Sequence, residues 1–128
     1  MGNIAIYGGS FDPPHKGHLL LAKNLAKECN ADKVLIIPAY SSPFKDGTVA
    51  EGTDRLAMCR HTFTDSIFEV SAIELNREGK SYTVDTIKDI KKYYRNIKKY
   101  INKNKYLLWR TLPFALMEIF TFIFALQI

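Results

Sequence analysis

Two histidines stand three residues apart at the end of a stretch rich in glycine and proline, Gly8-Gly9-Ser10-Phe11-Asp12-Pro13-Pro14-His15-Lys16-Gly17-His18. An imidazole N–H can donate a hydrogen bond to a phosphate oxygen, and it is a stronger donor when the ring is protonated. The glycine pair permits backbone turns that place amide N–H groups against phosphates, and the glycine between the histidines lets phosphates approach the backbone. A glycine pair or a single histidine is common on ordinary loops, but their combination predicts a phosphate-binding cradle.

The elements on either side of this stretch predict how it is positioned. Asn3–Tyr7 is a short apolar run that reads as a buried strand, and a helix is expected from about His18 to Cys29. Lys33–Pro38 is a second apolar strand, closed by a proline. Strand, helix and strand in some forty residues form a βαβ unit with parallel strands and a right-handed crossover. The cradle then lies between the first strand and the first helix, where doubly wound sheets bind nucleotides.

The next part of the chain continues this alternation. Ala39–Thr53 reads as a loop, after which Thr53 or Asp54 can cap a helix. Ile67–Ile73 is predicted to be a third strand, and Glu74–Lys80 a polar turn. Thr83 can cap a helix whose apolar stripe is Ile87, Ile90, Tyr94, Ile97 and Ile101. The fold class predicted is α/β, with a doubly wound parallel sheet.

The charge is distributed unevenly and does not indicate nucleic-acid binding. The formal net charge is +5, but eight lysines and arginines stand against one acid between Lys88 and Lys105, and the rest is slightly acidic. Such a run is usually the solvated face of a helix. The two cysteines, Cys29 and Cys59, are too few for a disulfide or metal framework and fit a reducing cytoplasm. No signal peptide or lipidation site is expected before the first strand, and nothing predicts an oligomeric state.

The stretch 8–18 resembles the signature of the nucleotidyltransferase superfamily related to class I aminoacyl-tRNA synthetases, Gly-x-Phe-Asp…His-x-Gly-His. The resemblance implies a Rossmann-like nucleotidyltransferase fold. It also implies that His15 and His18 contact the ATP phosphates and stabilise charge as pyrophosphate departs. No protein nucleophile is implied, because a phosphate of the substrate attacks the α-phosphorus in line with the help of Mg²⁺. The resemblance further assigns five cradle residues to ATP binding: Gly8, Gly9, Ser10, Phe11 and Gly17.

Within this superfamily, two blocks are most similar to nicotinate-nucleotide adenylyltransferases. The first is the spelling of residues 8–15, and the second is Glu74-Leu75-Asn76-Arg77-Glu78-Gly79-Lys80-Ser81-Tyr82-Thr83-Val84-Asp85-Thr86. The resemblance implies that Ser81, Tyr82 and Thr83 help to hold nicotinate mononucleotide. An aromatic face can stack on a pyridine ring and a helix N-terminus can receive its carboxylate, although the same residues also read as a helix cap. Ser42-Pro43-Phe44-Lys45 resembles a Pro-Pro-His-Lys loop that brings Lys45 to phosphates, with Phe44 in place of the histidine. Arg55 and Met58 match an Arg-x-x-Met pattern of the family, which implies that they mostly serve packing.

The resemblance stops at about Tyr94, and the chain is predicted to divide into an α/β domain over residues 1–105 and a hydrophobic tail over residues 106–128. Three interpretations of the tail remain open. It could span a membrane, against which Glu118 and Pro113 argue; it could replace core elements; or it could result from a frameshift or truncation, which we favour. On the last interpretation the nucleotidyltransferase fold is C-terminally incomplete and little adenylyltransferase activity is expected. The alternatives are a non-catalytic or membrane-tethered nucleotide-binding protein, and an adenylyltransferase for another substrate such as phosphopantetheine.

Overall fold

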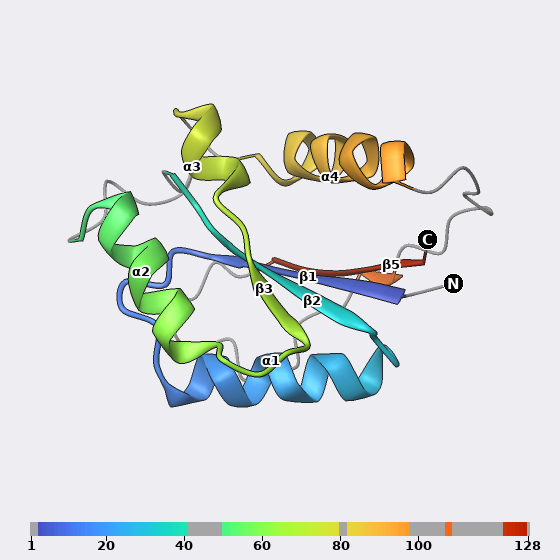
Figure 1. Cartoon of the computed structure of the whole chain (residues 1–128), viewed down its shortest axis with the longest axis horizontal. Helices are drawn as coiled ribbons and strands as arrows, with labels where there is room; N and C mark the ends of the chain where they lie inside the picture. Colours follow the sequence, from blue (N-terminus) through green and yellow to red (C-terminus); the bar gives the residue numbers. More distant parts are fainter. Residues whose placement is uncertain (1–2, 41–49, 80–81, 98–106, 109–121, 128) are drawn as a thin grey trace.

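The computed structural model describes residues 3–40, 50–79, 82–97, 107–108 and 122–127, and its strands form a single sheet in the order β3-β2-β1-β5-β4 (Figure 1). The strands and helices follow one another as β1 (Asn3–Gly9), α1 (Lys16–Glu28), β2 (Lys33–Pro38), α2 (Gly52–Thr62), β3 (Phe68–Val70), α3 (Ile73–Arg77), α4 (Thr83–Ile97), β4 (Leu107–Leu108) and β5 (Phe122–Gln127). β1, β2 and β3 are parallel, as predicted, with Ile4 opposite Lys33 and Val34 opposite Phe68. The α/β fold class is therefore confirmed.

The three parallel strands are apolar because helices cover both of their faces. Figure 1 shows α1 and α2 on one face of the sheet and α3 and α4 on the other. Alternate residues of a strand point to opposite faces, so Ala5 and Tyr7 join the core under α1 and α2. Ile4 and Ile6 join the core under α4, which includes Ile90. This burial on both faces accounts for the continuous apolar runs that marked the strands in the sequence.

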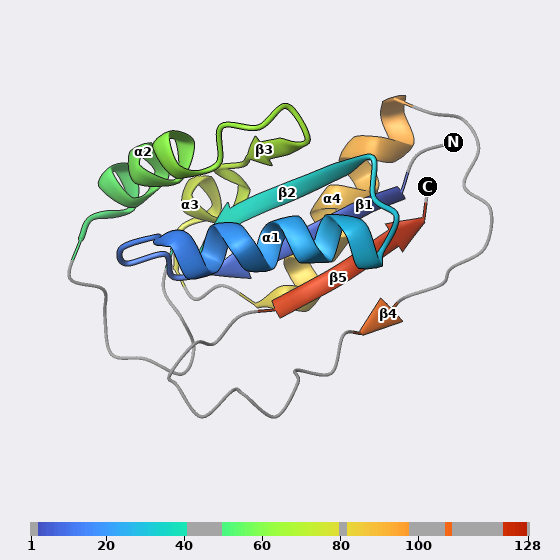
Figure 2. The same ribbon diagram turned by 90° about the horizontal axis from the view of Figure 1, so that it is seen from below.

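Part of the predicted tail belongs to the sheet. β5 pairs antiparallel with β1, with Asn3 opposite Gln127, and β4 pairs antiparallel with β5 (Figure 2). The sheet is therefore mixed, with an antiparallel pair beside β1. This agrees with the interpretation in which the tail supplies elements of the core, while the division at residue 105 stays a prediction. Among the residues that the structure describes, no helix is long and apolar enough to cross a bilayer.

Several predicted element boundaries are wrong. β1 does not end at Tyr7 but continues to Gly9, because Gly8 and Gly9 stay in register with the last two residues of β2. α1 begins at Lys16, two residues before the predicted start. The third strand is shorter than predicted, and the expected polar turn after it contains the short helix α3.

The helices predicted after residue 50 are present as α2 and α4, but their starts differ from the predicted caps. α2 begins at Gly52 after Glu51, so neither Thr53 nor Asp54 is its cap. α4 begins at Thr83, which is therefore its first helical residue and not its cap, whereas Ile87 and Ile90 pack against the sheet as the apolar stripe predicted. The remaining members of the predicted stripe, namely the side chains of Tyr94 and Ile97 and the whole of Ile101, lie outside what the structure describes.

Candidate active site

The two predicted histidines meet at the first turn of α1 and cap it reciprocally. His15 is the N-cap residue, and its Nδ1 accepts a hydrogen bond from the Gly17 amide at 3.1 Å. The His15 amide in turn donates to Nδ1 of His18 at 3.1 Å, and the two ring centroids are 3.9 Å apart. Since both Nδ1 atoms accept, we assign the ring proton of each histidine to Nε2. The cap therefore leaves two Nε2–H donors beside a helix N-terminus, where anions bind.

His18 is a neutral donor at physiological pH. Its side chain is only 8% exposed, whereas His15 is exposed. Burial, and secondly the neighbouring His15 ring, lower the pKa of His18 from 6.5 to about 4. Protonation would also place a hydrogen on Nδ1, which accepts the His15 amide. The sequence allowed a protonated His18 as a stronger donor; the folded chain instead holds this ring neutral.

This buried, neutral His18 should make the fold sensitive to acid. Because its folded pKa of about 4 lies below the ordinary value of 6.5, the unfolded chain takes up this proton first as the pH falls. The stability that neutral His18 contributes is complete above pH 6.5 and is lost between pH 6.5 and about 4. We expect a loss of about 3 kcal/mol in urea unfolding over this range, since each pKa unit corresponds to about 1.4 kcal/mol.

His18→Asn is the matched variant for this acid effect. An asparagine Oδ1 can accept the His15 amide in place of Nδ1 but does not titrate. Its unfolding free energy should therefore fall much less between pH 6.5 and 4 than that of the wild type. An equal fall in both proteins would assign the acid effect to groups other than His18.

The Phe11 ring packs against His18 on its buried side and does not face outward. Its ring is 2% exposed and packs edge-on against His18 at a centroid distance of 5.1 Å. It also contacts Tyr7 at 5.3 Å and Phe63 at 5.8 Å, so it joins the cradle to the core. The backbone of Phe11 is in the left-handed region, with φ 49°. What Phe11 can offer a phosphate is therefore its backbone N–H and not its ring.

The backbone turn of the cradle begins later than predicted. Gly8 and Gly9 are buried strand residues, and among the described glycines only Gly79 has a positive φ. The Gly9 carbonyl accepts a hydrogen bond from the Ala39 amide at 2.9 Å, so it ties β1 to the residue after β2. The prediction that the glycine pair itself makes the turn is wrong, because the ladder with β2 holds both residues in the strand. The chain leaves the strand at Ser10 and turns at Phe11.

A fully buried arginine lies behind the cradle. Arg55 of α2 is 1% exposed, and its Nη1 donates to the carbonyl oxygens of Ser10 at 2.8 Å and Ala39 at 2.7 Å. Its Nε donates to the Ala50 carbonyl at 3.1 Å, and its Nη2 to the Tyr40 carbonyl at 3.4 Å. Burial lowers the pKa of its guanidinium, whereas the nearby Asp12, Cys59 and Glu51 act in the opposite direction. The resemblance assigned Arg55 mostly to packing, and this interpretation missed its hydrogen bonds.

The second predicted block forms a polar network between α3 and α4. Thr86, which is fully buried, donates to Glu74 Oε1 and accepts from Arg77 at 2.9 Å. Arg77 also donates to Asp89 at 2.8 Å. The carbonyl of Tyr82 accepts from the amides of Asp85 and Thr86, at 3.1 and 3.2 Å. The network thus holds the first turn of α4 against α3.

Tyr82 stands immediately before this turn with its side chain 53% exposed. Its carbonyl serves as a cap acceptor while its ring remains accessible, so the two interpretations of the block are compatible. Figure 1 shows that α4 begins on the side toward which β1 runs and ends near the N-terminus. The N-terminus of α4 and the cradle therefore lie toward the same edge of the sheet. This is the edge at which the parallel strands end and where such sheets bind ligands.

The comparisons with known proteins agree with this geometry. The sequence profile of the cytidylyltransferase-like family matches residues 6–110, which include the cradle, Arg55 and Tyr82. The chain belongs to the cytidylyltransferase-like family. This confirms the resemblance to a nucleotidyltransferase superfamily that the cradle suggested.

Among curated proteins, this cytidylyltransferase-like chain is similar to several probable nicotinate-nucleotide adenylyltransferases. It is 45% identical to the one from Exiguobacterium sibiricum over 92 residues, which are 71% of this chain and 49% of that protein. It is 40% identical to the one from Halalkalibacterium halodurans over 101 residues, 77% of this chain and 49% of that protein. For the one from Aquifex aeolicus the identity is 39% over 90 residues, 70% and 54% of the two chains. The chain spans about half the length of the curated relatives it matches.

Not all the predicted site residues of this cytidylyltransferase-like chain can be placed. His15, His18, Ser10, Phe11 and Gly17 lie together at the start of α1. Lys45 and Ser81 lie outside the described residues, and of Thr83 only the backbone is described. Within the described ranges no group of three or more histidine, cysteine, aspartate or glutamate side chains could hold a metal ion.

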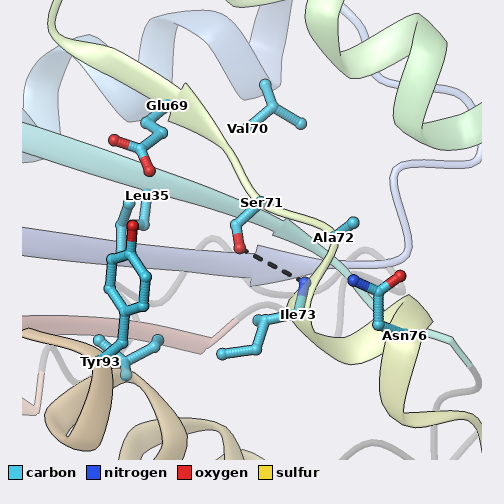
Figure 3. Close-up of a pocket in the computed structure, with 9 residues that line it drawn as sticks. Leu35, Glu69, Val70, Ser71, Ala72, Ile73, Asn76 and Tyr93 are labelled. Carbon is cyan, nitrogen blue, oxygen red and sulfur yellow. Dashed lines mark hydrogen bonds between the residues drawn. The ribbon is translucent and has the colours of Figure 1, made fainter.

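A hollow of about 360 Å³ lies elsewhere, between β3, α3 and α4 (Figure 3). A hydrogen bond of 3.4 Å from the Ile73 amide to Ser71 Oγ holds the chain at its edge. The hollow is lined by Leu35, Glu69, Val70, Ser71, Ala72, Ile73, Asn76, Ile90 and Tyr93. None of these is a predicted site residue, so the hollow is separate from the cradle.

Gly17 leaves room for the His15 ring, and this gives a direct test of the cradle. A Cβ at position 17 would lie 2.9 Å from His15 Cε1 and 3.0 Å from His15 Nδ1, so the ring must shift. Displacing the N-cap ring costs about 0.5–2 kcal/mol, but alanine favours a helix over glycine by about 0.5–1 kcal/mol, so the two effects partly cancel and Gly17→Ala should cost little stability. We expect ATP affinity measured by calorimetry to fall about tenfold, the cost of one hydrogen bond to a charged group. Unchanged affinity would show that the position of His15 does not matter for ATP.

Proposed function

We propose that this cytidylyltransferase-like chain carries the substrate sites for adenylyl transfer from ATP to nicotinate mononucleotide, a step of NAD biosynthesis. The observation that carries the proposal is the histidine pair at the start of α1, where the reciprocal cap leaves both Nε2–H groups as donors. The names of the relatives, probable nicotinate-nucleotide adenylyltransferases, favour nicotinate mononucleotide as the acceptor of the adenylyl group. The product would be nicotinate adenine dinucleotide.

In the proposed reaction, a phosphate oxygen of the mononucleotide attacks the α-phosphorus of ATP in line. A new P–O bond joins the two nucleotides as the bond from the α-phosphorus to the bridging oxygen breaks, and pyrophosphate leaves with that electron pair. His15 and His18 donate Nε2–H to phosphate oxygens and stabilise the charge that develops on the leaving group. A bound Mg²⁺ would neutralise phosphate charge. No residue of the chain forms a covalent bond to the substrate.

The other predicted site residues are assigned either to ATP or to the mononucleotide. Gly8, Gly9, Ser10, Phe11 and Gly17 would meet ATP through the backbone, with Phe11 holding His18 from below. Lys45 would add a positive charge for the phosphates. Ser81, Tyr82 and Thr83 would hold the mononucleotide, with the exposed ring of Tyr82 available for stacking on the pyridine.

The two free cysteines, Cys29 and Cys59, are compatible with a reducing cytoplasm, where we place the protein.

Calorimetry can distinguish nicotinate mononucleotide from phosphopantetheine as the acceptor. The chain is saturated with an unreactive ATP analogue and Mg²⁺, and nicotinate mononucleotide or phosphopantetheine is then titrated in a calorimeter. We expect nicotinate mononucleotide to bind at least about tenfold more tightly, a difference of about 1.4 kcal/mol. Tighter binding of phosphopantetheine would contradict the proposed acceptor and favour the other adenylyltransferase.

A further inference from the structure

Arg55 brings together three segments that are far apart in the sequence. Its four carbonyl acceptors are Ser10 after β1, Ala39 and Tyr40 after β2, and Ala50 before α2. Asp12 reinforces the same junction, because its Oδ1 accepts the Ala50 amide at 3.1 Å. The guanidinium therefore sets the distance between the cradle and the two segments that flank it.

Burying the Arg55 guanidinium costs more free energy than is expected for a residue that only fills space. A buried charge costs free energy unless it is hydrogen-bonded, and an apolar side chain of similar volume often packs at least as well. The guanidinium recovers this cost through hydrogen bonds to backbone carbonyls from three of its nitrogens. A planar fork with five N–H groups can join several carbonyls at once, whereas a lysine ammonium cannot reproduce that geometry.

The hydrogen bond from Arg55 to the Ser10 carbonyl is separated from the proposed phosphate site by a single peptide group. The carbonyl of Ser10 and the amide of Phe11 belong to the same peptide group. A charged donor on the carbonyl polarises this group and makes its N–H a stronger donor, as in other chains of hydrogen bonds. The same peptide leads into the left-handed turn at Phe11, whose ring supports His18. Arg55 thus acts on both the direction and the strength of cradle donors.

We propose that Arg55 is a positioning residue for phosphate binding, which fixes the Ser10–Phe11 peptide in the cradle and strengthens the Phe11 N–H as a donor to a phosphate oxygen. The inference rests on the proposed function, since it needs nucleotide phosphates at the start of α1. Arg55 does not touch the nucleotide in this account, because it is buried behind the backbone that it holds.

The test compares Arg55→Met, which removes the charge and the fork, with Arg55→Lys, which keeps only the charge. Leu25→Ala is the control for lost stability, because Leu25 is a buried residue of the same core on α1. Affinities for ATP and for inorganic tripolyphosphate are measured at a temperature where all variants are folded. We expect Arg55→Met to bind both at least about tenfold more weakly than the wild type, with Arg55→Lys intermediate and Leu25→Ala unchanged.

Amide hydrogen exchange provides a second measurement on the same proteins. The Ala39 amide, which donates to the Gly9 carbonyl beside the Arg55 acceptors, should exchange faster in Arg55→Met than in Leu25→Ala. In the wild type, the Phe11 amide signal should move downfield when tripolyphosphate is added, and this needs no variant to fold.

The outcomes separate the two proposals. Wild-type protein that binds neither ATP nor tripolyphosphate would overturn the proposed function. Wild-type binding with equal affinity in the Arg55 variants would overturn only the role of Arg55, as would a Phe11 amide that tripolyphosphate leaves unmoved. Equal losses in Arg55→Met and Leu25→Ala would reduce Arg55 to a stabilising residue and would also contradict the inference.

Discussion

Replacing His18 with alanine is expected to weaken ATP binding by about 10- to 100-fold, because a hydrogen bond to a charged group contributes about 1.5–3 kcal/mol. The Nε2–H of His18 is positioned by the His15 amide on one side and by the Phe11 ring on the other. His15→Ala should lower ATP affinity by a similar factor, and it should also cost about 0.5–2 kcal/mol of stability because it removes the N-cap acceptor of α1.

Calorimetric titration with ATP and Mg²⁺ measures both histidine variants. Asn24→Ala is the control, since Asn24 is an exposed residue on the same helix, two turns from the cap. Unchanged ATP affinity in both histidine variants would remove the phosphate role from the pair. A loss in Asn24→Ala as large as in His18→Ala would show that the effect comes from the helix as a whole.

Replacing Tyr82 with alanine should weaken the binding of nicotinate mononucleotide by about tenfold and leave ATP binding unchanged. Stacking of an aromatic side chain on a base contributes about 1–3 kcal/mol in proteins that bind single-stranded nucleic acids, and Tyr82 is 53% exposed. The backbone role of Tyr82 as a cap acceptor does not depend on its side chain. The substitution should therefore separate the binding role from the capping role.

Two further variants control for this effect. Tyr82→Phe keeps the ring and should bind the mononucleotide nearly as well as the wild type. Val84→Ala truncates a neighbouring side chain that is 63% exposed, and it should change neither affinity. If Tyr82→Ala lowers the affinities for ATP and the mononucleotide equally, Tyr82 is a neighbour of the cap and has no specific role in the pocket.

The parallel part of the fold could be predicted because its signals are local. β2 has the predicted bounds, and α4 begins one residue before the predicted start. Strand ends were harder, because Gly8 and Gly9 read as a turn and only their register with β2 holds them in β1. α3 was missed for a related reason. Its five residues are held by bonds to Thr86 and Asp89, nine to twelve positions further along the chain.

The sequence indicated candidate residues for the site, but not how the fold holds them. The spacing of His15 and His18 indicated phosphate chemistry, but the reciprocal cap that positions Nε2–H and the burial that lowers the pKa of His18 depend on the fold. Arg55 gave no usable signal, because its acceptors are backbone carbonyls of segments up to 45 residues away. A charged residue in a helix beside buried apolar positions was the only available indication.

If the two proposed substrate sites are adjacent, one ligand, nicotinate adenine dinucleotide, should span the cradle and the start of α4. This expectation is tested most directly by titrating this dinucleotide into isotopically labelled protein and following the backbone amide signals. We predict that the signals of Ser10, Phe11, Gly17 and His18 and those of Tyr82 and Val84 shift together along one binding curve, while Lys27 and Glu28 at the far end of α1 do not move. No shifts, or shifts confined to residues outside these two segments, would contradict the account.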